Sequence, residues 1–230
     1  MNRQSVIPMD ETELLSLENF VGDENRMLIA ELTGLITGIR QSRVIYIWGQ
    51  PGSGKTHLLR ACCFENQRLG QTSIYCSLEG IDTENHIAGI SDPNSLVCID
   101  DLDAIELAGQ MQKILFHMVQ FLQAGGGCLL VSGNCQLTEI GLTLKDLESR
   151  LNSGGIFRIN PLNDEEKKDA LRTRAIQKGF VLDEQVLNYI LIHYSRKVRD
   201  LFDLLDRLGN ESLRSRRKIT IPFIRKLFNQ

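Results

Sequence analysis

The sequence predicts an α/β fold with a parallel five-stranded sheet, followed by a small domain built only of helices. Short apolar, β-rich segments alternate with helical patterns over the first part of the chain, which is the order of an α/β domain. The segment SLVCID (95–100) is apolar on both faces, as in a parallel strand that helices cover on both sides. After Pro161 only helical patterns follow. We therefore expect a mobile N-terminal arm at 1–13, an α/β domain at 14–160 and a helical domain at 161–230.

The first domain is expected to begin with a helix over 24–36, where apolar residues recur at helical spacing. Further helices are expected over 55–69 and about 104–122. The sheet is expected to consist of five β-rich segments, namely RVIYIW (43–48), TSIYCSL (72–78), SLVCID (95–100), GGCLLVSGN (126–134) and GIFRI (155–159).

Four helices are expected in the second domain. Asn163 and Glu166 have the spacing of a capping box at the start of the first helix, and Gly179 fits its end. A second helix follows. KVRDLFDLLDRLG (197–209) has apolar residues along one face of a third helix, and IPFIRKLF (221–228) begins a fourth.

The net charge of −3 conceals an asymmetry between the two parts of the chain. Residues 1–160 carry 11 Lys and Arg against 19 Asp and Glu, whereas residues 161–230 carry 15 against 10. This excess of positive charge is too small to predict a nucleic-acid-binding face. We interpret the basic segment RSRRK (214–218) as a solvated loop in preference to a DNA contact.

The composition is that of a soluble globular protein. The chain has no run of about 18 apolar residues and no secretory leader, so we expect no membrane span and no export. None of the six cysteines forms a C-x-x-C pair. These features predict a cytoplasmic protein whose thiols are reduced.

The clearest motif is GQPGSGKT (49–56), which matches the P-loop pattern G-x-x-x-x-G-K-[ST]. It follows an expected strand and opens an expected helix, the context that the motif requires. Its glycines let backbone N–H groups surround a phosphate, and the helix N-terminus adds a partial positive charge. We expect Lys55 to reach the β- and γ-phosphates and Thr56 to bind Mg²⁺. The expected nucleotide-binding residues of this segment are Gln50, Pro51, Gly52, Ser53, Gly54, Lys55, Thr56 and His57.

Polar residues end two of the later strands. Asp100 ends an apolar strand and is expected to lie beside the metal ion, as the Walker B carboxylate does in P-loop ATPases. Asp101 follows directly and is a candidate general base that polarises the attacking water. Asn134 ends the fourth strand, where a polar residue lies between the metal carboxylate and the γ-phosphate in one class of P-loop ATPase. Taken alone, Asn134 fits the cap of a turn equally well.

The order of these motifs, followed by LESRL (147–151) and a helical domain with RKVRDL (196–201), resembles that of AAA+ ATPases. Four segments are similar to the DnaA family of bacterial replication-initiation proteins: LENFVGDENRMLIAEL, GSGKTHLLRA, VCIDDLDAI and KVRDLFDLLDRL. The resemblance covers nearly the whole chain, from about residue 17 to 227. It implies an AAA+ P-loop NTPase core with a C-terminal helical lid, which binds ADP or ATP with Mg²⁺.

The resemblance also implies roles for two arginines. Arg150 matches the arginine that points at the nucleotide of a neighbouring subunit and stabilises charge on the transferring phosphoryl group. Arg199 matches the sensor 2 arginine, which reaches from the lid to the phosphates of its own subunit. Without the family, the simpler interpretation of Arg150 is a solvated charge at a helix end, and Arg199 and Asp203 have the i,i+4 spacing of an ordinary surface pair.

The chain resembles an initiator that has been reduced to its ATPase core, which is the architecture of the Hda group within the family. Hda proteins act with the DNA-loaded sliding clamp of DNA polymerase III and make the initiator DnaA hydrolyse its ATP, which prevents re-initiation. They carry a clamp-binding peptide of the type Q-L-x-L-P-L near the N-terminus. Here Gln4, Ile7, Pro8 and Met9 keep that pattern, and Ser5 departs from it. Self-oligomers and a weak direct DNA contact are compatible with this resemblance.

Two other functions compete with this interpretation. An AAA+ helicase- or transposase-loader ATPase would bind single-stranded DNA and turn over ATP itself. A metabolic P-loop kinase would phosphorylate a small molecule, but it has no use for an arginine that acts on another subunit. For the regulatory interpretation we expect at most weak intrinsic ATPase activity, because a second subunit must supply the arginine to complete a site.

Overall fold

The computed structural model of the chain describes residues 16–17, 20, 22–38, 43–79, 87, 89–104 and 109–228. The chain divides into two compact units: unit 1 contains Asp23–Pro161 and unit 2 contains Leu162–Gln230. The N-terminal segment that was expected to be an arm lies outside the described residues. Within the described parts of the chain, no helix has the length and apolar character that a membrane crossing would need.

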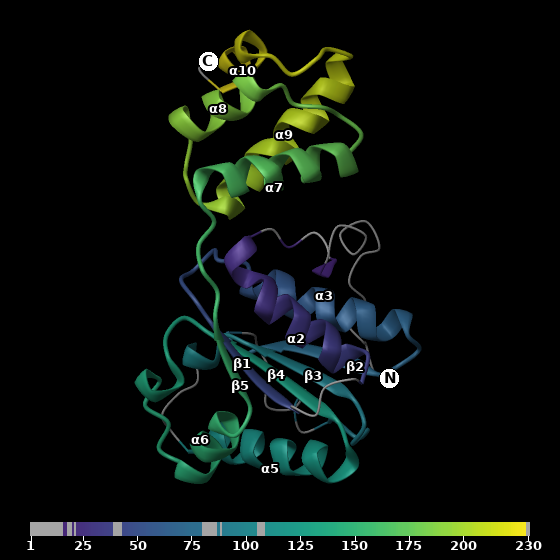
Figure 1. Cartoon of the computed structure of the whole chain (residues 1–230), viewed down its shortest axis with the longest axis vertical. Coiled ribbons are helices and arrows are strands. Elements are labelled where there is room, and N and C mark those ends of the chain that lie inside the picture. The colour runs from purple at the N-terminus through teal and green to yellow at the C-terminus, as the bar shows by residue number, and fades with distance from the viewer. Residues whose placement is uncertain are drawn as a thin grey trace. The chain divides into compact units, whose positions relative to one another are not determined.

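Unit 1 is an α/β layer structure around a parallel five-stranded sheet with the strand order β2-β3-β4-β1-β5. The strands are β1 (Val44–Trp48), β2 (Ser73–Ser77), β3 (Leu96–Asp100), β4 (Cys128–Gly133) and β5 (Gly155–Arg158). Figure 1 shows helices on both faces of the sheet, with α2 (Arg26–Ile36) and α3 (Lys55–Arg68) on one face and α5 (Gln110–Gly125) and α6 (Lys145–Asn152) on the other. The predicted α/β fold with a parallel five-stranded sheet is confirmed.

The side chains of the central strands alternate between the two faces and are buried on both. Tyr46 and Val131 belong to the core cluster that includes apolar residues of α5 and α6. Ile45 and Ile47, which alternate with Tyr46 in β1, are also fully buried. Burial on both faces explains why these strands are continuous apolar runs instead of alternating patterns.

The strand order determines where the functional segments meet. β1 lies between β4 and β5, and β3 lies beside β4. In parallel strands the carboxyl ends share one edge of the sheet, so the segments that follow β1, β3 and β4 converge there. The P-loop follows β1, Asp100 ends β3 and Asn134 follows β4.

Two helices differ from their predicted bounds. The expected helix over 104–122 is a short 3-10 helix, η3 (Leu102–Ala104), and then α5, which extends to Gly125 before the left-handed Gly126 ends it. In unit 2, α9 (Val198–Ser215) continues beyond the predicted end at Gly209. Gly209 is accommodated inside the helix because the ring of Phe180 packs against it, where a Cβ atom would lie 2.6 Å from Cε1.

The helices described in unit 2 are α7 (Asp164–Gln177), α8 (Glu184–His193), α9 and α10 (Ile221–Phe228), which pack around their own apolar core. The predicted capping box begins α7: the Glu166 amide donates to Asn163 Oδ1 at 2.9 Å, and the Asn163 amide donates to Glu166 Oε2 at 2.7 Å. These reciprocal bonds satisfy two of the helix's otherwise unpaired N–H groups.

An ion pair joins α7 to α9 in unit 2. Arg174 donates to both carboxylate oxygens of Asp206, with Nη2 2.8 Å from Oδ2 and Nε 3.2 Å from Oδ1. Lys178 Nζ lies 2.9 Å from Asp206 Oδ1. Burial acts to raise the pKa of Asp206, but the hydrogen bonds and charges of Arg174 and Lys178 outweigh it and hold the pKa below its usual value.

We expect Asp206→Asn to lower the free energy of unfolding at pH 7 by about 1 kcal/mol, or Tm by about 2–4 °C. A lowered carboxyl pKa contributes stability above the unfolded pKa and loses it as the pH falls through the folded pKa. The difference between wild type and variant should therefore shrink as the pH falls from 5 to 3, in thermal unfolding followed by circular dichroism.

Asp203→Asn is the matched control, because Asp203 lies on the same helix, is exposed, and has no ion pair within the described residues. This control should leave Tm nearly unchanged at every pH. An equal loss in Asp206→Asn at pH 3 and pH 7 would contradict the electrostatic explanation.

Candidate nucleotide-binding site

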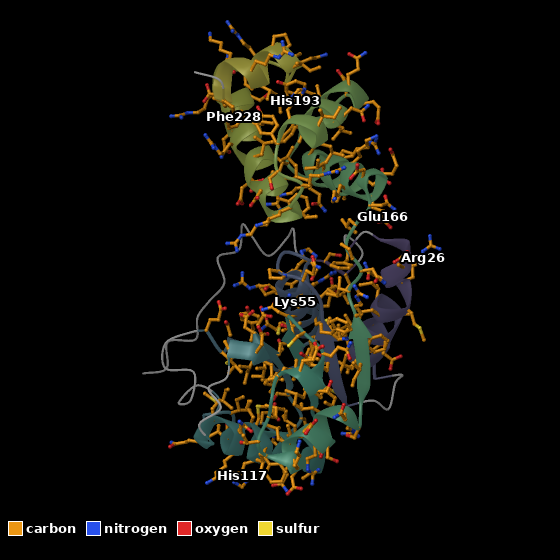
Figure 2. All side chains as sticks on the ribbon, turned by 90° about the vertical axis from the view of Figure 1, so that its left-hand side faces the viewer. Arg26, Lys55, His117, Glu166, His193 and Phe228 are labelled. Carbon is orange, nitrogen blue, oxygen red and sulfur yellow. The ribbon has the colours of Figure 1, made fainter. Side chains whose placement is uncertain are left out.

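The P-loop connects β1 to α3 and surrounds a cationic side chain. Gly54 has φ +99° at the start of α3, a left-handed conformation that side chains with a Cβ rarely adopt. Lys55 is the first residue of α3 and is 6% exposed. Its Nζ donates to the carbonyl oxygens of Gly49 at 2.8 Å and Gln50 at 3.2 Å, and to Asn134 Oδ1 at 2.9 Å. Figure 2 shows Lys55 within unit 1.

The loop has the properties of an anion site. Burial lowers the pKa of Lys55, and the carboxylates of Asp100, Asp103 and Asp101 act in the opposite direction. Ser53 Oγ, in the same loop, is buried and has no hydrogen-bond partner within the described residues. A buried cation bonded to neutral carbonyl groups, next to an unsatisfied hydroxyl and a helix N-terminus, suits the oxygen atoms of a phosphate.

Asp100 lies at the centre of a hydrogen-bonded cluster and is 1% exposed. Thr56 Oγ1 in α3 donates to Asp100 Oδ2 at 2.7 Å, and Tyr75 Oη in β2 donates to the same oxygen at 2.8 Å. Ser132 Oγ in β4 donates to Asp100 Oδ1. The structure therefore brings together Thr56 and Asp100, the two residues predicted to bind the metal ion.

This pair fits Mg²⁺. A hydroxyl and a carboxylate within hydrogen-bonding distance are both oxygen ligands, and Mg²⁺ usually takes one or two of these from the protein with phosphate and water completing the octahedron. Within the described residues, no group of three or more His, Cys, Asp and Glu side chains is arranged to hold a metal ion. The site thus suits a metal ion that arrives with a nucleotide. Bound there, Mg²⁺ would neutralise charge on the phosphates.

Asp101 has an unusual backbone conformation for a residue other than glycine, with φ +61°. Its Oδ2 accepts a hydrogen bond from Ser77 Oγ at 2.9 Å. Burial raises the pKa of Asp101, and the bond from Ser77 opposes this. A carboxylate that takes up a proton more readily than usual suits the predicted role of general base.

Asn134 is held by a residue that the sequence analysis missed. Its backbone N–H donates to Asp103 Oδ1 at 2.8 Å and its Nδ2 donates to Asp103 Oδ2 at 2.6 Å. These two bonds orient its Oδ1 toward Lys55. Asp103 is the third acid of the segment DDLD, but its spacing alone does not indicate a partner 31 residues away. Tyr75 and Ser132 were also missed. The position of Ser132 near the end of β4 was an available signal, whereas Tyr75 lies in the middle of β2.

The remaining predicted residues lie in several places. Gln50 is exposed in the P-loop, and His57 Nε2 lies 3.3 Å from the carbonyl oxygen of Ser16, in the segment that precedes α2. Arg150 lies on α6 and interacts with α5: its Nη1 donates to Gln123 Oε1, and its guanidinium carbon is 5.6 Å from the centre of the Phe116 ring. The predicted clamp-binding residues Gln4, Ile7, Pro8 and Met9 lie outside the described residues.

Comparison with known proteins agrees with this geometry. A family model described as "Hda, lid domain" matches residues 164–228. An "Uncharacterized protein" of Haemophilus influenzae (strain Rd) is 35% identical over 233 residues, which is 100% of both chains. Domain III of the Thermotoga maritima replication initiation protein DnaA superposes with a TM-score of 0.79 at 19% identity and covers 94% of this chain and 96% of that one.

Two further structures have the same fold. AMPPCP-bound DnaA from Aquifex aeolicus gives a TM-score of 0.71 at 21% identity, over 88% of this chain and 69% of that one. The Thermotoga maritima RuvB Holliday junction branch migration motor gives 0.70 at 19% identity, over 94% and 71%. The chain thus has the fold of these DnaA and RuvB structures, and its residues 164–228 are similar to the Hda lid domain. The predicted AAA+ core with a helical C-terminal lid is therefore confirmed.

The region that matches the Hda lid carries the residue predicted as sensor 2. Arg199 is in the first turn of α9 and is exposed. It lies in unit 2, and the P-loop lies in unit 1. Its predicted contact with the nucleotide stays a prediction.

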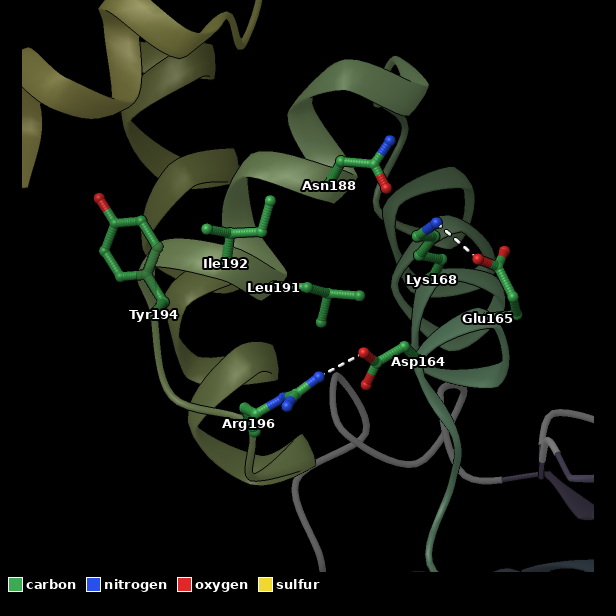
Figure 3. A pocket seen from close by; sticks show the side chains of 8 residues that line it. All are labelled: Asp164, Glu165, Lys168, Asn188, Leu191, Ile192, Tyr194 and Arg196. Carbon is green, nitrogen blue, oxygen red and sulfur yellow. Dashed lines mark hydrogen bonds and ion pairs between the residues drawn. The ribbon is translucent and has the colours of Figure 1, made fainter.

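The lid also contains an open pocket of about 450 Å³ between α7 and α8, shown in Figure 3. Its charged groups are already paired with one another. Arg196 pairs with Asp164, and Lys168 Nζ lies 2.7 Å from Glu165 Oε1. The charges lining this pocket are therefore largely neutralised, in contrast to the buried cation of the P-loop.

We expect Lys55→Met to weaken binding of fluorescent mant-ADP about 10- to 100-fold both with Mg²⁺ and with EDTA, because a charged hydrogen bond to phosphate is lost. Asp100→Asn should remove only the part of the affinity that Mg²⁺ supplies and leave binding in EDTA unchanged or stronger. Fluorescence titrations under the two conditions measure both effects.

Lys113→Met is the control, because Lys113 is an exposed cation on α5, and it should bind mant-ADP as the wild type does. Unaltered binding by Lys55→Met would exclude the P-loop as the phosphate site. An Asp100→Asn defect of equal size in EDTA and Mg²⁺ would exclude the assigned metal role.

Proposed function

We propose that this chain is a nucleotide-bound regulator of chromosomal replication initiation. With the DNA-loaded sliding clamp, it would stimulate hydrolysis of the ATP bound to the initiator DnaA and so prevent re-initiation. The observation that carries this proposal is the match of residues 164–228 to the Hda lid, in a chain whose core places Lys55 beside Asn134 at the P-loop and Thr56 beside Asp100.

The bound nucleotide in this proposal is ADP or ATP with Mg²⁺, and it serves mainly to hold the protein in a shape that can assemble. Support comes from the AMPPCP-bound DnaA structure and from Lys55, whose buried charge a phosphate would satisfy. Intrinsic hydrolysis by an isolated subunit is at most weak. Asp101 and Asn134 are available for chemistry, but the arginine finger must come from another subunit.

Arg150 acts in trans on the initiator's ATP in this proposal. Its interactions within the chain support such a role. Gln123 and Phe116 orient the guanidinium group, and neither of them carries a negative charge that would neutralise it. An arginine that is positioned but still fully charged can stabilise the charge that develops on a transferring phosphoryl group.

The partner that brings the protein to DNA would be the β sliding clamp, bound through Gln4, Ile7, Pro8 and Met9. This assignment rests on the sequence of that peptide. An extended peptide of this type places the glutamine in a polar pocket of the clamp and its apolar residues in an adjacent apolar pocket. The setting is the cytoplasm, where the clamp and the initiator meet.

We expect the protein to bind immobilised clamp with a Kd of about 1–10 μM, and the double variant Gln4→Ala with Ile7→Ala to lose this binding by at least tenfold. Surface plasmon resonance measures both. Asn2→Ala with Arg3→Ala is the matched control, because it changes the same segment outside the peptide pattern. Failure of the wild type to bind would remove the clamp from the proposal and favour a loader ATPase.

We expect Arg150→Ala to abolish stimulation of DnaA-bound ATP hydrolysis, with a loss of about 10³-fold in the stimulated rate. Binding to mant-ADP and to the clamp should be retained. Lys145→Ala is the control, since Lys145 is an exposed cation on the same helix, and it should stimulate normally.

Hydrolysis is measured as conversion of radiolabelled ATP on DnaA, in the presence of clamp loaded on DNA. Full stimulation by Arg150→Ala would mean that this residue is not the finger. A parallel loss in Lys145→Ala would indicate a binding surface on α6 in place of a catalytic arginine.

A further inference from the structure

The end of α9 and the turn that follows it carry a concentration of positive charge. Residues 207–228 contain seven Lys and Arg and only one acidic residue, Glu211. Five of the cations form what we call the basic surface, and all five are exposed: Arg207, Arg214, Arg216, Arg217 and Lys218. The rest of the lid, residues 162–206, has nearly balanced charge.

The cations of the basic surface lack ion-pair partners within the described residues, unlike the cations of α7. Lys168, Arg172 and Arg174 all pair with carboxylates. In contrast, none of the five cations of the basic surface has an ion pair within the described residues. Neighbouring unpaired cations repel one another, so the lid gains no stability from this arrangement.

The turn that bears these cations has a defined conformation. Arg216 ends α9 with φ +52° and ψ +38°, a left-handed conformation that costs a residue with a Cβ about 1 kcal/mol. Ser212 Oγ donates to the Arg217 carbonyl oxygen at 2.6 Å, and the Arg217 amide donates to the Ser212 carbonyl oxygen at 3.2 Å. Ile219, which follows, is buried. The backbone therefore holds the Cα atoms of these residues at defined positions, from which the basic side chains extend into solvent.

The spacing of the cations fits a chain of phosphates. Arg207 and Arg214 are seven residues apart in α9, so they share one face and are about 10 Å apart along the helix. One strand of duplex DNA has a phosphate about every 3.4 Å of helix axis, so α9 lying along that axis would span about three phosphates. Arg217 and Lys218 extend the same positive surface beyond the helix. Guanidinium groups bind phosphate oxygens in a bidentate manner, which suits a surface made mostly of arginine.

We propose that the basic surface binds the phosphate backbone of double-stranded DNA. From the sequence alone, the segment 214–218 was interpreted as a solvated loop in preference to a DNA contact. Because its cations have no ion-pair partners in the described part of the lid, we now favour the DNA contact. The inference goes beyond the proposed function and does not depend on it, because it uses only residues of unit 2.

Two other anionic surfaces fit the structure less well. A helix that binds membranes keeps an apolar face available to lipid, but the apolar face of α9 is buried in the lid core through Leu201, Leu205 and Leu208. Proteins that bind single strands present aromatic rings on which bases stack. The ring of Phe228, beside Arg207, already packs against Tyr194 at 5.7 Å.

The test measures fluorescence anisotropy of a labelled 30-base-pair duplex titrated with the full-length protein. At 50 mM KCl we expect a Kd of about 1–10 μM, and a slope of about −4 when log K is plotted against log[KCl]. The triple variant Arg214→Gln, Arg217→Gln, Lys218→Gln should bind at least tenfold more weakly, with a slope smaller by about 3. Arg216 is left unchanged because of its left-handed backbone.

The matched control is Arg68→Gln, Lys113→Gln, Lys145→Gln, which makes the same change in net charge at exposed sites of unit 1. It should keep Kd within about twofold, since long-range effects of net charge are screened over about 10 Å. The variant Arg214→Lys with Arg217→Lys retains the charge and should bind within about threefold of wild type. Circular dichroism and mant-ADP binding verify the fold of each protein.

Four outcomes would overturn the proposal. The first is that the wild type does not bind the duplex at 100 μM protein, and the second is that the two triple variants lose the same amount of affinity. The third is tighter binding to a single strand of the same sequence. The fourth is that the triple variant of the basic surface loses binding to phosphatidylserine vesicles but keeps binding to the duplex. The clamp and Arg150 experiments use other residues, so either proposal can fail while the other stands.

Discussion

The site depends on one buried carboxylate. Asp100 ends the third strand almost without exposure, and three hydroxyl groups donate to it from three different elements: Thr56 in α3, Tyr75 in β2 and Ser132 in β4. A buried acceptor of this kind is costly unless it is fully hydrogen-bonded, so the cluster fixes the positions of its donors as well as its own. The P-loop helix, the sheet edge and the metal ligand are thus aligned by the same set of hydrogen bonds. A metal ion would enter between groups that already lie together.

A second network links the phosphate site to the fourth strand. Asp103 holds the backbone and amide groups of Asn134, and Asn134 in turn accepts a hydrogen bond from Lys55. Lys55 therefore contacts the loop carbonyl groups on one side and the end of β4 on the other. A phosphate bound at the P-loop would compete for the same ammonium group, so it would change the hydrogen bonds of both Lys55 and Asn134.

The sequence was sufficient for features that depend on local pattern. The P-loop, the doubly apolar strands and the capping box of Asn163 were all predictable because each is specified within a few neighbouring residues. The roles of Tyr75, Ser132 and Asp103 were not, because they arise from the strand order that brings β2, β3 and β4 side by side. Helix ends were predicted less accurately for a similar reason: the ring of Phe180 stabilises Gly209 within α9, and the contact joins residues far apart in sequence.

Arg150 and the cations of the basic surface share one property. Each has a defined place in the fold but no carboxylate partner within the described residues. No acidic group within the described residues pairs with Arg150, although Glu148 lies on the same helix and pairs with Lys145 instead. An arginine engaged by an amide and an aromatic ring can be transferred to a phosphate at lower cost than one that must leave a carboxylate. In contrast, the cations of α7 form ion pairs, such as that of Arg174 with Asp206. The fold thus separates arginines that stabilise the lid from arginines that stay available to an anion supplied by another molecule.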